Sequence, residues 1–366
     1  MTTIEGGNMA QLRNVRGRNM AMSMEVIQRV TENFDDKNIV GSGGFGNVYR
    51  GQLDDGRQVA VKRMNLTSNN NMGQNEFEAE IAVLTEVRHS HLVELLGYCT
   101  YGNERILVYE YMPQGALSRH LFEWEQDGGS SLTWKQRVTI ALDVARGVDY
   151  LHTRANKKFI HRDIKPANIL LGNDLRAKVS DFGLVRNTSD ENSSVQTRYG
   201  GTAGYVPPEI LFGKVTRKLD VYAFGAILME MLTGRKALDN KLAEDDQHLV
   251  TMFRRKFLLN RVDIQNLIDP TLDQSNEEIY GGIWTVAQLA YHCTADNHTA
   301  RPEMAQVLTT LAPLVEQWCP PAHEEQEEEE ENASEIHMSL GQLTETWKFE
   351  DKVSTNSTHS SMVQDA

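Results

Sequence analysis

The chain has 366 residues, 40% hydrophobic and 24% charged, which is ordinary for globular proteins and long enough for two domains or one two-lobed unit. The net charge is −14, and residues 320–366 supply −10 of it, because they hold twelve Asp and Glu against two Lys. The remaining −4 excludes the basic surface that general nucleic-acid binding requires, so we expect no nucleic-acid partner. The three cysteines are too few and too scattered for a disulfide framework or a zinc site.

No segment of the chain predicts insertion into a membrane. The longest apolar run, residues 221–232, contains Glu230 and is shorter than the roughly 18 to 20 residues that span a bilayer. The N-terminus lacks the apolar core of a signal peptide. We therefore expect a cytoplasmic chain without a membrane span.

The first predicted elements are two strands around a glycine-rich loop. Residues 1–33 show no clear periodicity and are interpreted as a flexible arm. The run GSGGFGNV, residues 41–48, follows, and its glycines would let backbone N–H groups approach a polyphosphate. A dinucleotide-binding loop would open a helix, whereas Asn47, Val48 and Tyr49 favour a strand.

The next stretch predicts more strands and one helix. Residues 57–64 alternate as a half-buried strand that places Ala60 and Lys62 on one face. A helix with Phe77 and Ile81 on its apolar face follows and carries Glu80. A lysine on a strand and a glutamate on a helix are usually solvated, so only mutual contact would give them a special role. Further strands are predicted at residues 92–97 and 106–111, and a lobe boundary near residue 112.

A long helix then leads to the most informative stretch, HRDIKPANIL, residues 161–170. Thr133 and Gln136 form a capping box, and apolar residues hold a helical period up to residue 151. In the stretch itself, Asp163 can accept a hydroxyl proton, and the oxygen of Asn168 suits a hard metal ion. Taken alone, the stretch also fits a basic loop between a helix and a strand.

The order of the motifs resembles the protein kinase family. The chain contains, in the family's order, GSGGFGNV, VAVK ending at Lys62, Glu80, HRDIKPAN, DFG at 181–183 and PPE at 207–209. The resemblance covers about residues 34–313 and implies an α+β, two-lobed protein kinase fold. Its N-lobe, about 34–111, would be small and mainly antiparallel β with one key helix, and its C-lobe, about 112–313, larger and mainly helical. Residues 314–366 would form an acidic, disordered tail.

The resemblance also implies site roles. Asp163 would orient the substrate hydroxyl and accept its proton, Lys165 would screen the transferring phosphate, and Lys62 would bind phosphates while held by Glu80. Asn168 and Asp181 would bind Mg²⁺, with Mn²⁺ as an alternative. The implied ATP-binding residues are Gly41, Ser42, Gly43, Gly44, Phe45, Gly46, Val48, Ala60, Lys62, Tyr109, Glu110 and Met112.

Structural and regulatory residues follow from the same resemblance. Asp220 would tie down the catalytic-loop backbone, and Arg301 would pair with Glu209. Lys165 together with Thr202 resembles Ser/Thr kinases rather than tyrosine kinases, with dual specificity as the alternative. Residues 181–209 are rich in hydroxyls, and Arg162, with Lys178 as a second cation, would pair with a phosphate there. The predicted phosphosites are Thr197, as the main ordering site, and Ser193, Ser194 and Thr202, the last mainly contacting the catalytic loop.

More narrowly, LVYEYMPQGALSRHLFEW and IALDVARGVDYLH resemble plant receptor-like kinases, most of all the TMK (transmembrane kinase) subfamily. This implies protein substrates, receptor or co-receptor kinase partners, and attachment to the inner face of the plasma membrane through partners or a membrane segment outside this chain. A catalytically impaired kinase-fold scaffold is the alternative. It is disfavoured because no charged catalytic group is missing, although Pro207 replaces the family's alanine.

Overall fold

The computed structural model describes residues 21–44, 46–65, 72–126, 128–155, 157–187, 201–259 and 264–317. It divides into two compact units, Met1–Val315 and Glu316–Ala366, and the account below concerns the first. The predicted tail lies outside the described residues from residue 318 onward. Within the part that the structure describes, no helix combines the length and apolarity needed to cross a membrane.

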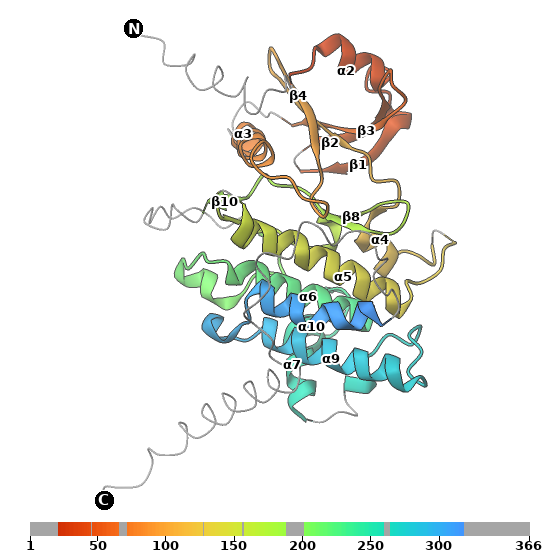
Figure 1. The fold of residues 1–366 in the computed structure, drawn as a ribbon, viewed down its shortest axis with the longest axis vertical. Helices are drawn as coiled ribbons and strands as arrows, with labels where there is room; N and C mark the ends of the chain where they lie inside the picture. The colour runs from red at the N-terminus through yellow and green to blue at the C-terminus, as the bar shows by residue number, and fades with distance from the viewer. Residues whose placement is uncertain are drawn as a thin grey trace, which may run out of the picture. The chain divides into compact units, whose positions relative to one another are not determined.

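The N-terminal region is built on a five-stranded antiparallel sheet (Figure 1). Its strands, in spatial order, are β1 (Ile39–Gly43), β2 (Gly46–Gln52), β3 (Gln58–Met64), β5 (Glu104–Glu110) and β4 (Leu95–Tyr101). β3 and β5 are interior strands of this sheet. In β5 four successive residues, 106–109, are buried, because both faces of the strand are covered.

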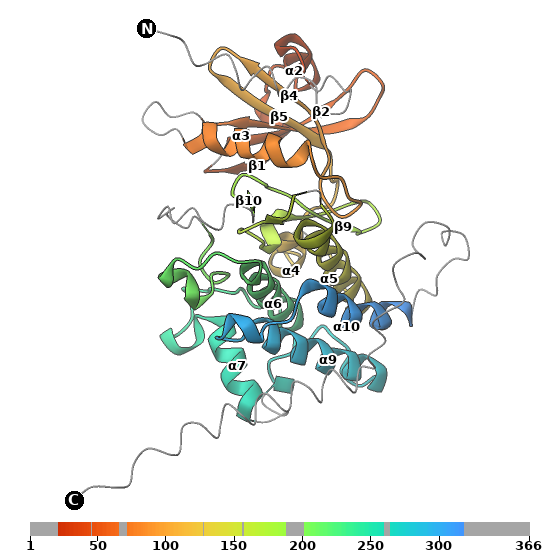
Figure 2. The ribbon, with the colours of Figure 1, turned by 60° about the vertical axis from the view of Figure 1, so that its left-hand side comes forward.

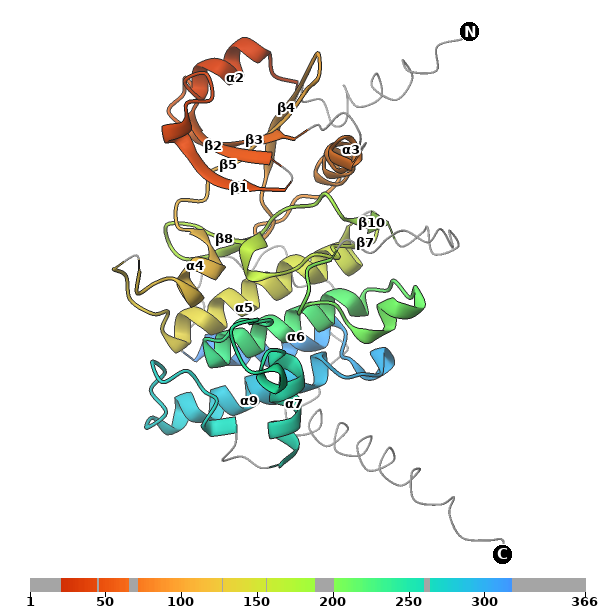
Figure 3. The same cartoon turned by 180° about the vertical axis from the view of Figure 1, so that it is seen from behind.

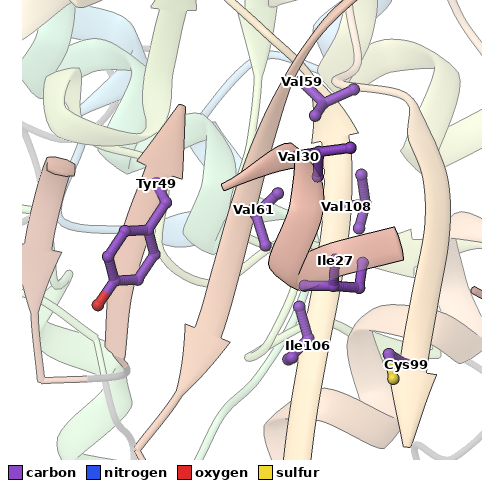
Figure 4. Packing of buried hydrophobic residues seen from close by; sticks show 8 residues of the cluster. All are labelled: Ile27, Val30, Tyr49, Val59, Val61, Cys99, Ile106 and Val108. Atoms are coloured by element: carbon purple, nitrogen blue, oxygen red, sulfur yellow. The ribbon is translucent and has the colours of Figure 1, made fainter. Parts of the chain in front are cut away.

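Helix α2 (Met24–Val30) packs on the sheet, so the prediction of an unstructured arm up to residue 33 was wrong for its last part. Ser23 caps the helix, and Ile27 and Val30 lie three residues apart on its buried face. Figure 4 shows these two side chains over the valines of β3 and β5. A helix of seven residues is too short to be recognised by its period, and its stability comes from this packing.

Helix α3 (Met72–Leu84) packs against β5 at the side of the sheet (Figure 2). Phe77 and Ile81 are 1% exposed, so the predicted apolar face is the buried one. The strand predicted at residues 92–97 begins later, at Leu95. Its first residues pair elsewhere, because the N–H of Val93 donates to the carbonyl of Val179 at 2.9 Å.

The C-terminal region is mainly helical (Figure 3). The α-helices with described bounds are α4 (Leu117–Phe122), α5 (Trp134–Asp149), α6 (Lys218–Thr233), α7 (Leu249–Leu259), α9 (Glu277–Cys293) and α10 (Met304–Glu316). Short strands form two small sheets: β6 (Gly115–Ala116), β8 (Ile169–Leu171) and β9 (Ala177–Val179) in one, and β7 (Phe159–Ile160) with β10 (Arg186–Asn187) in the other. Among the described residues, the short helices are the π-helix η3 (Tyr150–Arg154) and the 3-10 helices η2 (Asp36–Asn38), η4 (Pro166–Asn168), η6 (Pro208–Phe212), η7 (Glu244–Asp246) and η8 (His298–Ala300).

Two helices form the frame of this region. α5 begins at the predicted capping box, with both reciprocal bonds of Thr133 and Gln136 present. α6 is buried all along its length from Leu219 to Thr233, as expected for a helix enclosed by others, and ends at the left-handed Gly234. The two-lobed α+β architecture is therefore confirmed, with an antiparallel sheet followed by a helical region.

Candidate active site

A cavity of about 560 Å³ is lined by residues from both regions, between the sheet and β8. This volume falls within the roughly 300 to 1,000 Å³ of small-molecule sites. Ten residues that the sequence analysis assigned to the site line it: Gly41, Val48, Ala60, Lys62, Glu80, Tyr109, Glu110, Met112, Asn168 and Asp181. Residues far apart in the chain thus meet around one space.

Only some residues of the glycine-rich loop line the cavity. Ser42, Gly43, Gly44 and Gly46 do not line the cavity, and residue 45 lies outside the described residues. Gly46 has a φ of 140°, and a Cβ there would lie 2.0 Å from the carbonyl oxygen of Arg63, so the packing of β3 demands a glycine. A Cβ on Gly43 or Gly44 would meet no atom within 4 Å, so protein packing does not explain those two glycines.

Lys62 connects two carboxylates across the cavity. Its Nζ lies 3.1 Å from Oε2 of Glu80 on α3 and 2.9 Å from Oδ1 of Asp181. Burial, the largest influence, opposes the charged form, yet the two carboxylates together raise the pKa of Lys62 above its ordinary value. The same cation lowers the pKa of Asp181 in spite of its burial. The lysine is therefore charged, and Glu80 holds it in place.

Asp163 is the centre of a dense set of donors. Its Oδ1 accepts the hydroxyl of Thr202 at 2.7 Å, and its Oδ2 accepts Lys165 Nζ at 2.7 Å and Asn168 Nδ2 at 3.1 Å. Lys165 also donates to Thr202 Oγ1 at 2.8 Å. The amide nitrogen of Asn168 faces Asp163, so its oxygen is directed away and suits a hard cation beside Asp181. This arrangement combines a carboxylate for a proton with oxygen ligands for a metal.

Asp220 on α6 supports the loop that carries Asp163. Its two oxygens accept the backbone N–H groups of His161 and Arg162, each at 2.8 Å, and Oδ2 lies 2.7 Å from His152 Nε2. Burial opposes its ionisation, but these hydrogen bonds lower the pKa of Asp220. Arg162 has a left-handed φ of 72°, which a residue with a Cβ adopts only when its surroundings hold it. A buried carboxylate thus fixes the strained backbone of the loop that carries Asp163.

Arg301 and Glu209 form a second buried link. The guanidinium donates two bonds to the carboxylate, at 2.6 and 2.8 Å, and the two side chains are 0% and 8% exposed. The pair joins Glu209 in η6, which follows the hydroxyl-rich segment, to Arg301, the residue directly after η8. Its bidentate geometry is the one that suits burial of both charges.

Lys178 differs from the expectation. Its Nζ lies 2.8 and 2.7 Å from the two carboxylate oxygens of Glu110, so it is engaged at the rim of the cavity rather than directed at a phosphorylated segment. Neither the strand period nor the motif order indicates this pairing, because the two residues are 68 positions apart. Val93 and Leu170, which also line the cavity, were missed as well. The sequence gives a weak indication that Leu170 lines the cavity, because it lies two residues after Asn168. It gives no such indication for Val93.

Of the predicted phosphosites, only Thr202 is described, and it contacts Asp163 and Lys165 in the predicted catalytic loop. Thr197, Ser193 and Ser194 lie outside the described residues. Arg162 Nη1 donates to the carbonyl of Leu184 at 3.3 Å, which places its side chain beside the start of that segment.

Comparisons with known proteins agree with this geometry. The family model described as the protein kinase domain matches residues 34–311. The chain belongs to the protein kinase family. The kinase is 56% identical over 346 residues to the receptor-like kinase TMK4 of Arabidopsis thaliana. The aligned residues cover 94% of this chain and 37% of TMK4.

Two other relatives extend the comparison. The kinase is 50% identical to the receptor protein kinase WSS1 of Oryza sativa subsp. japonica, over 96% of this chain and 38% of the relative. It is 39% identical to the serine/threonine-protein kinase CDG1 of Arabidopsis thaliana, over 82% of this chain and 70% of the relative. The kinase spans little more than a third of the receptor-like relatives TMK4 and WSS1. The resemblance to the TMK receptor-like kinases is confirmed.

Proposed function

We propose that the chain is an active Ser/Thr protein kinase that transfers the γ-phosphoryl group of Mg²⁺-ATP to protein hydroxyls. The observation that carries the proposal is the contact set of Asp163 with Lys165 and Thr202. A carboxylate held at this position can orient a substrate hydroxyl and take its proton, while Lys165 offsets charge on the transferring group. The 39% identical relative named a serine/threonine kinase supports the hydroxyl specificity.

The nucleotide and its metal fit the residues present. A bound divalent ion would neutralise the negative charge of the phosphates. Asp181 and the oxygen of Asn168 would hold it, and the cavity lined by Ala60, Tyr109 and Met112 would take the base. Gly41 of the glycine-rich loop lines the cavity, and a Cβ at Gly43 or Gly44 would meet no protein atom within 4 Å, which leaves room for the phosphates. Mg²⁺ suits such an oxygen set, with Mn²⁺ as an alternative.

Phosphorylation of its own segment between Asp181 and Glu209 is part of the proposal. Thr197 would be the main ordering site, with Ser193 and Ser194 as further sites. The phosphate group on this segment would form an ion pair with Arg162. Mass spectrometry of the autophosphorylated protein tests this. Thr197→Ala should lower activity, and full activity with an otherwise unchanged phosphorylation pattern would exclude the assignment.

We further propose that the kinase acts in receptor-like kinase signalling, with protein substrates and receptor or co-receptor kinases as partners. The 56% and 53% identities to the TMK receptor-like kinases support this. Its place would be the cytoplasmic face of the plasma membrane. The domain division stays part of the proposal, with a kinase domain over 34–313 between an N-terminal arm and an acidic tail. The family model, which spans residues 34–311, supports the kinase part of it.

The decisive experiment measures incorporation of phosphate from γ-labelled ATP into the protein and into a generic Ser/Thr substrate. Asp163→Asn should lower incorporation by about 10²- to 10⁴-fold, the range for loss of a general base. Asp174→Asn is the matched control, because Asp174 is an exposed loop carboxylate that accepts the N–H of Arg176. Equal incorporation by wild type and Asp163→Asn would favour the impaired scaffold instead.

A further inference from the structure

An uncommon backbone joins α2 to the sheet. Glu32, Asn33 and Phe34 have φ values of 52°, 58° and 58°, all left-handed. Residues with a Cβ disfavour this conformation, and three in succession persist only where the surroundings hold them. Thr31 does so here: its hydroxyl donates to the carbonyl of Ile27 at 2.8 Å and accepts the N–H of Phe34 at 3.1 Å.

This turn places the ring of Phe34 against β2 and β3. The ring lies edge-to-face on Tyr49, with centroids 5.3 Å apart and an interplanar angle of 69°. The guanidinium carbon of Arg63 is 4.7 Å from the Phe34 centroid. Arg63 is itself fixed by two bonds to Glu104, at 2.9 and 2.5 Å. Phe34 is thus held by both an aromatic and a cation–π contact.

Tyr49 connects this contact to the glycine-rich hairpin formed by β1 and β2. Val48 lines the cavity, so strand alternation directs Asn47 and Tyr49 to the opposite face of β2. Nδ2 of Asn47 lies 3.5 Å from the Tyr49 hydroxyl, and its Oδ1 accepts the hydroxyl of Ser42 at 2.7 Å. Ser42 and Asn47 are cross-strand partners of β1 and β2. A row of contacts therefore runs from Phe34 to both strands of the hairpin.

We propose that Phe34 is a positioning residue for the glycine-rich loop. Its ring fixes Tyr49, Tyr49 and Asn47 brace the outer face of the hairpin, and the described residues on both sides of the loop, 42–44 and 46–49, are held in one geometry. This explains why the chain maintains a disfavoured turn before β1. The consequence for nucleotide binding rests on the proposed kinase function, whereas the effect on the hairpin itself does not.

Hydrogen–deuterium exchange of the full chain without nucleotide tests the proposal directly. Phe34→Leu should raise exchange of amides in residues 42–49 about three- to tenfold, the factor that corresponds to losing one aromatic pair. Phe34→Tyr, which keeps the ring, should restore protection. Tyr101→Leu is the matched aromatic control, because Tyr101 is 65% exposed at the end of β4.

A control variant distinguishes a local effect of Phe34 on the hairpin from a general loss of protein stability. Ile27→Val trims a fully buried residue of α2 that belongs to the same hydrophobic cluster as Tyr49, and it leaves the rings of Phe34 and Tyr49 in place. It should lower the unfolding temperature yet leave exchange in residues 42–49 unchanged. Unchanged exchange in Phe34→Leu, or an equal rise in Ile27→Val, would overturn the proposal.

Kinetics provide a second, separate measurement. In Phe34→Leu the KM for ATP should rise about three- to tenfold while the KM for a peptide substrate stays constant, since only the nucleotide loop is released. Parallel changes in both constants would contradict the proposal. Absence of phosphotransfer in the wild type would remove the proposed function alone, because the exchange experiment contains no nucleotide and still decides the role of Phe34.

Discussion

The Nζ of Lys178 on β9 lies 2.7 Å from Oε2 of Glu110, the last residue of β5. The same carboxylate accepts the backbone N–H of Glu94 at 2.7 Å. The strand that leads out of the sheet is therefore tied, at the rim of the cavity, to a strand of the helical region. The ion pair bridges the two regions beside the chain connection that joins them.

Removing this cation should weaken the fold measurably. Lys178→Met leaves Glu110 with the Glu94 N–H but no positive partner, and we expect the free energy of unfolding to fall by about 1 kcal/mol, the upper range for such pairs. The two side chains are 25% and 26% exposed, so solvent screens the pair only in part. Denaturant unfolding measures the change. In the control Lys157→Met, which breaks an ion pair whose lysine is 54% exposed, the loss should stay below about 0.5 kcal/mol.

Glu230 gives a pH dependence of known sign. Burial raises its pKa to about 8, although Tyr205 and the N–H of Ala237 each donate to its Oε1 at 2.8 Å. Its folded-state pKa exceeds the unfolded value near 4.5, so the folded state binds more protons. The stability contribution is complete below pH 4.5 and is lost as the pH rises to about 8.

The test replaces the carboxyl group with an uncharged group of the same shape. Glu230→Gln should flatten the fall in unfolding temperature between pH 5 and about 8, and it should be more stable than the wild type at the upper end. The difference between the two proteins isolates Glu230 from other titrating groups, among them Glu76, whose pKa burial raises to about 7. Parallel curves across this window would show that Glu230 does not titrate there.

Two helix glycines should respond to alanine with opposite signs. A Cβ at Gly225 in α6 would lie 2.7 Å from Cβ of Cys293 and from Cγ2 of Thr294, so Gly225→Ala should destabilise by about 1 to 3 kcal/mol through overpacking. A Cβ at Gly281 in α9 would meet no atom within 4 Å, so Gly281→Ala should stabilise by up to about 1 kcal/mol through helix propensity. Thermal unfolding distinguishes them. A gain of stability in Gly225→Ala would mean that α6 and α9 separate easily.

Local patterns were sufficient for much of the fold. Alternation at Val59 and Val61 predicted β3 and placed Lys62 toward the cavity. The capping box at Thr133 predicted the start of α5, because a cap is a contact within four residues. The motif order, interpreted through the family resemblance, predicted which charged residues meet around the cavity.

The sequence by itself therefore determined the elements whose signals are local and the residues whose types carry the chemistry. Only the tertiary structure decided where α2 packs, where β4 begins, that Lys178 pairs with Glu110, and that Gly46 is needed beneath Arg63. Each of these depends on contacts between segments distant in the chain. Many residues have the same intrinsic propensity to form such a contact, and burial and close packing determine which of them do. A local sequence pattern contains no information about these contacts.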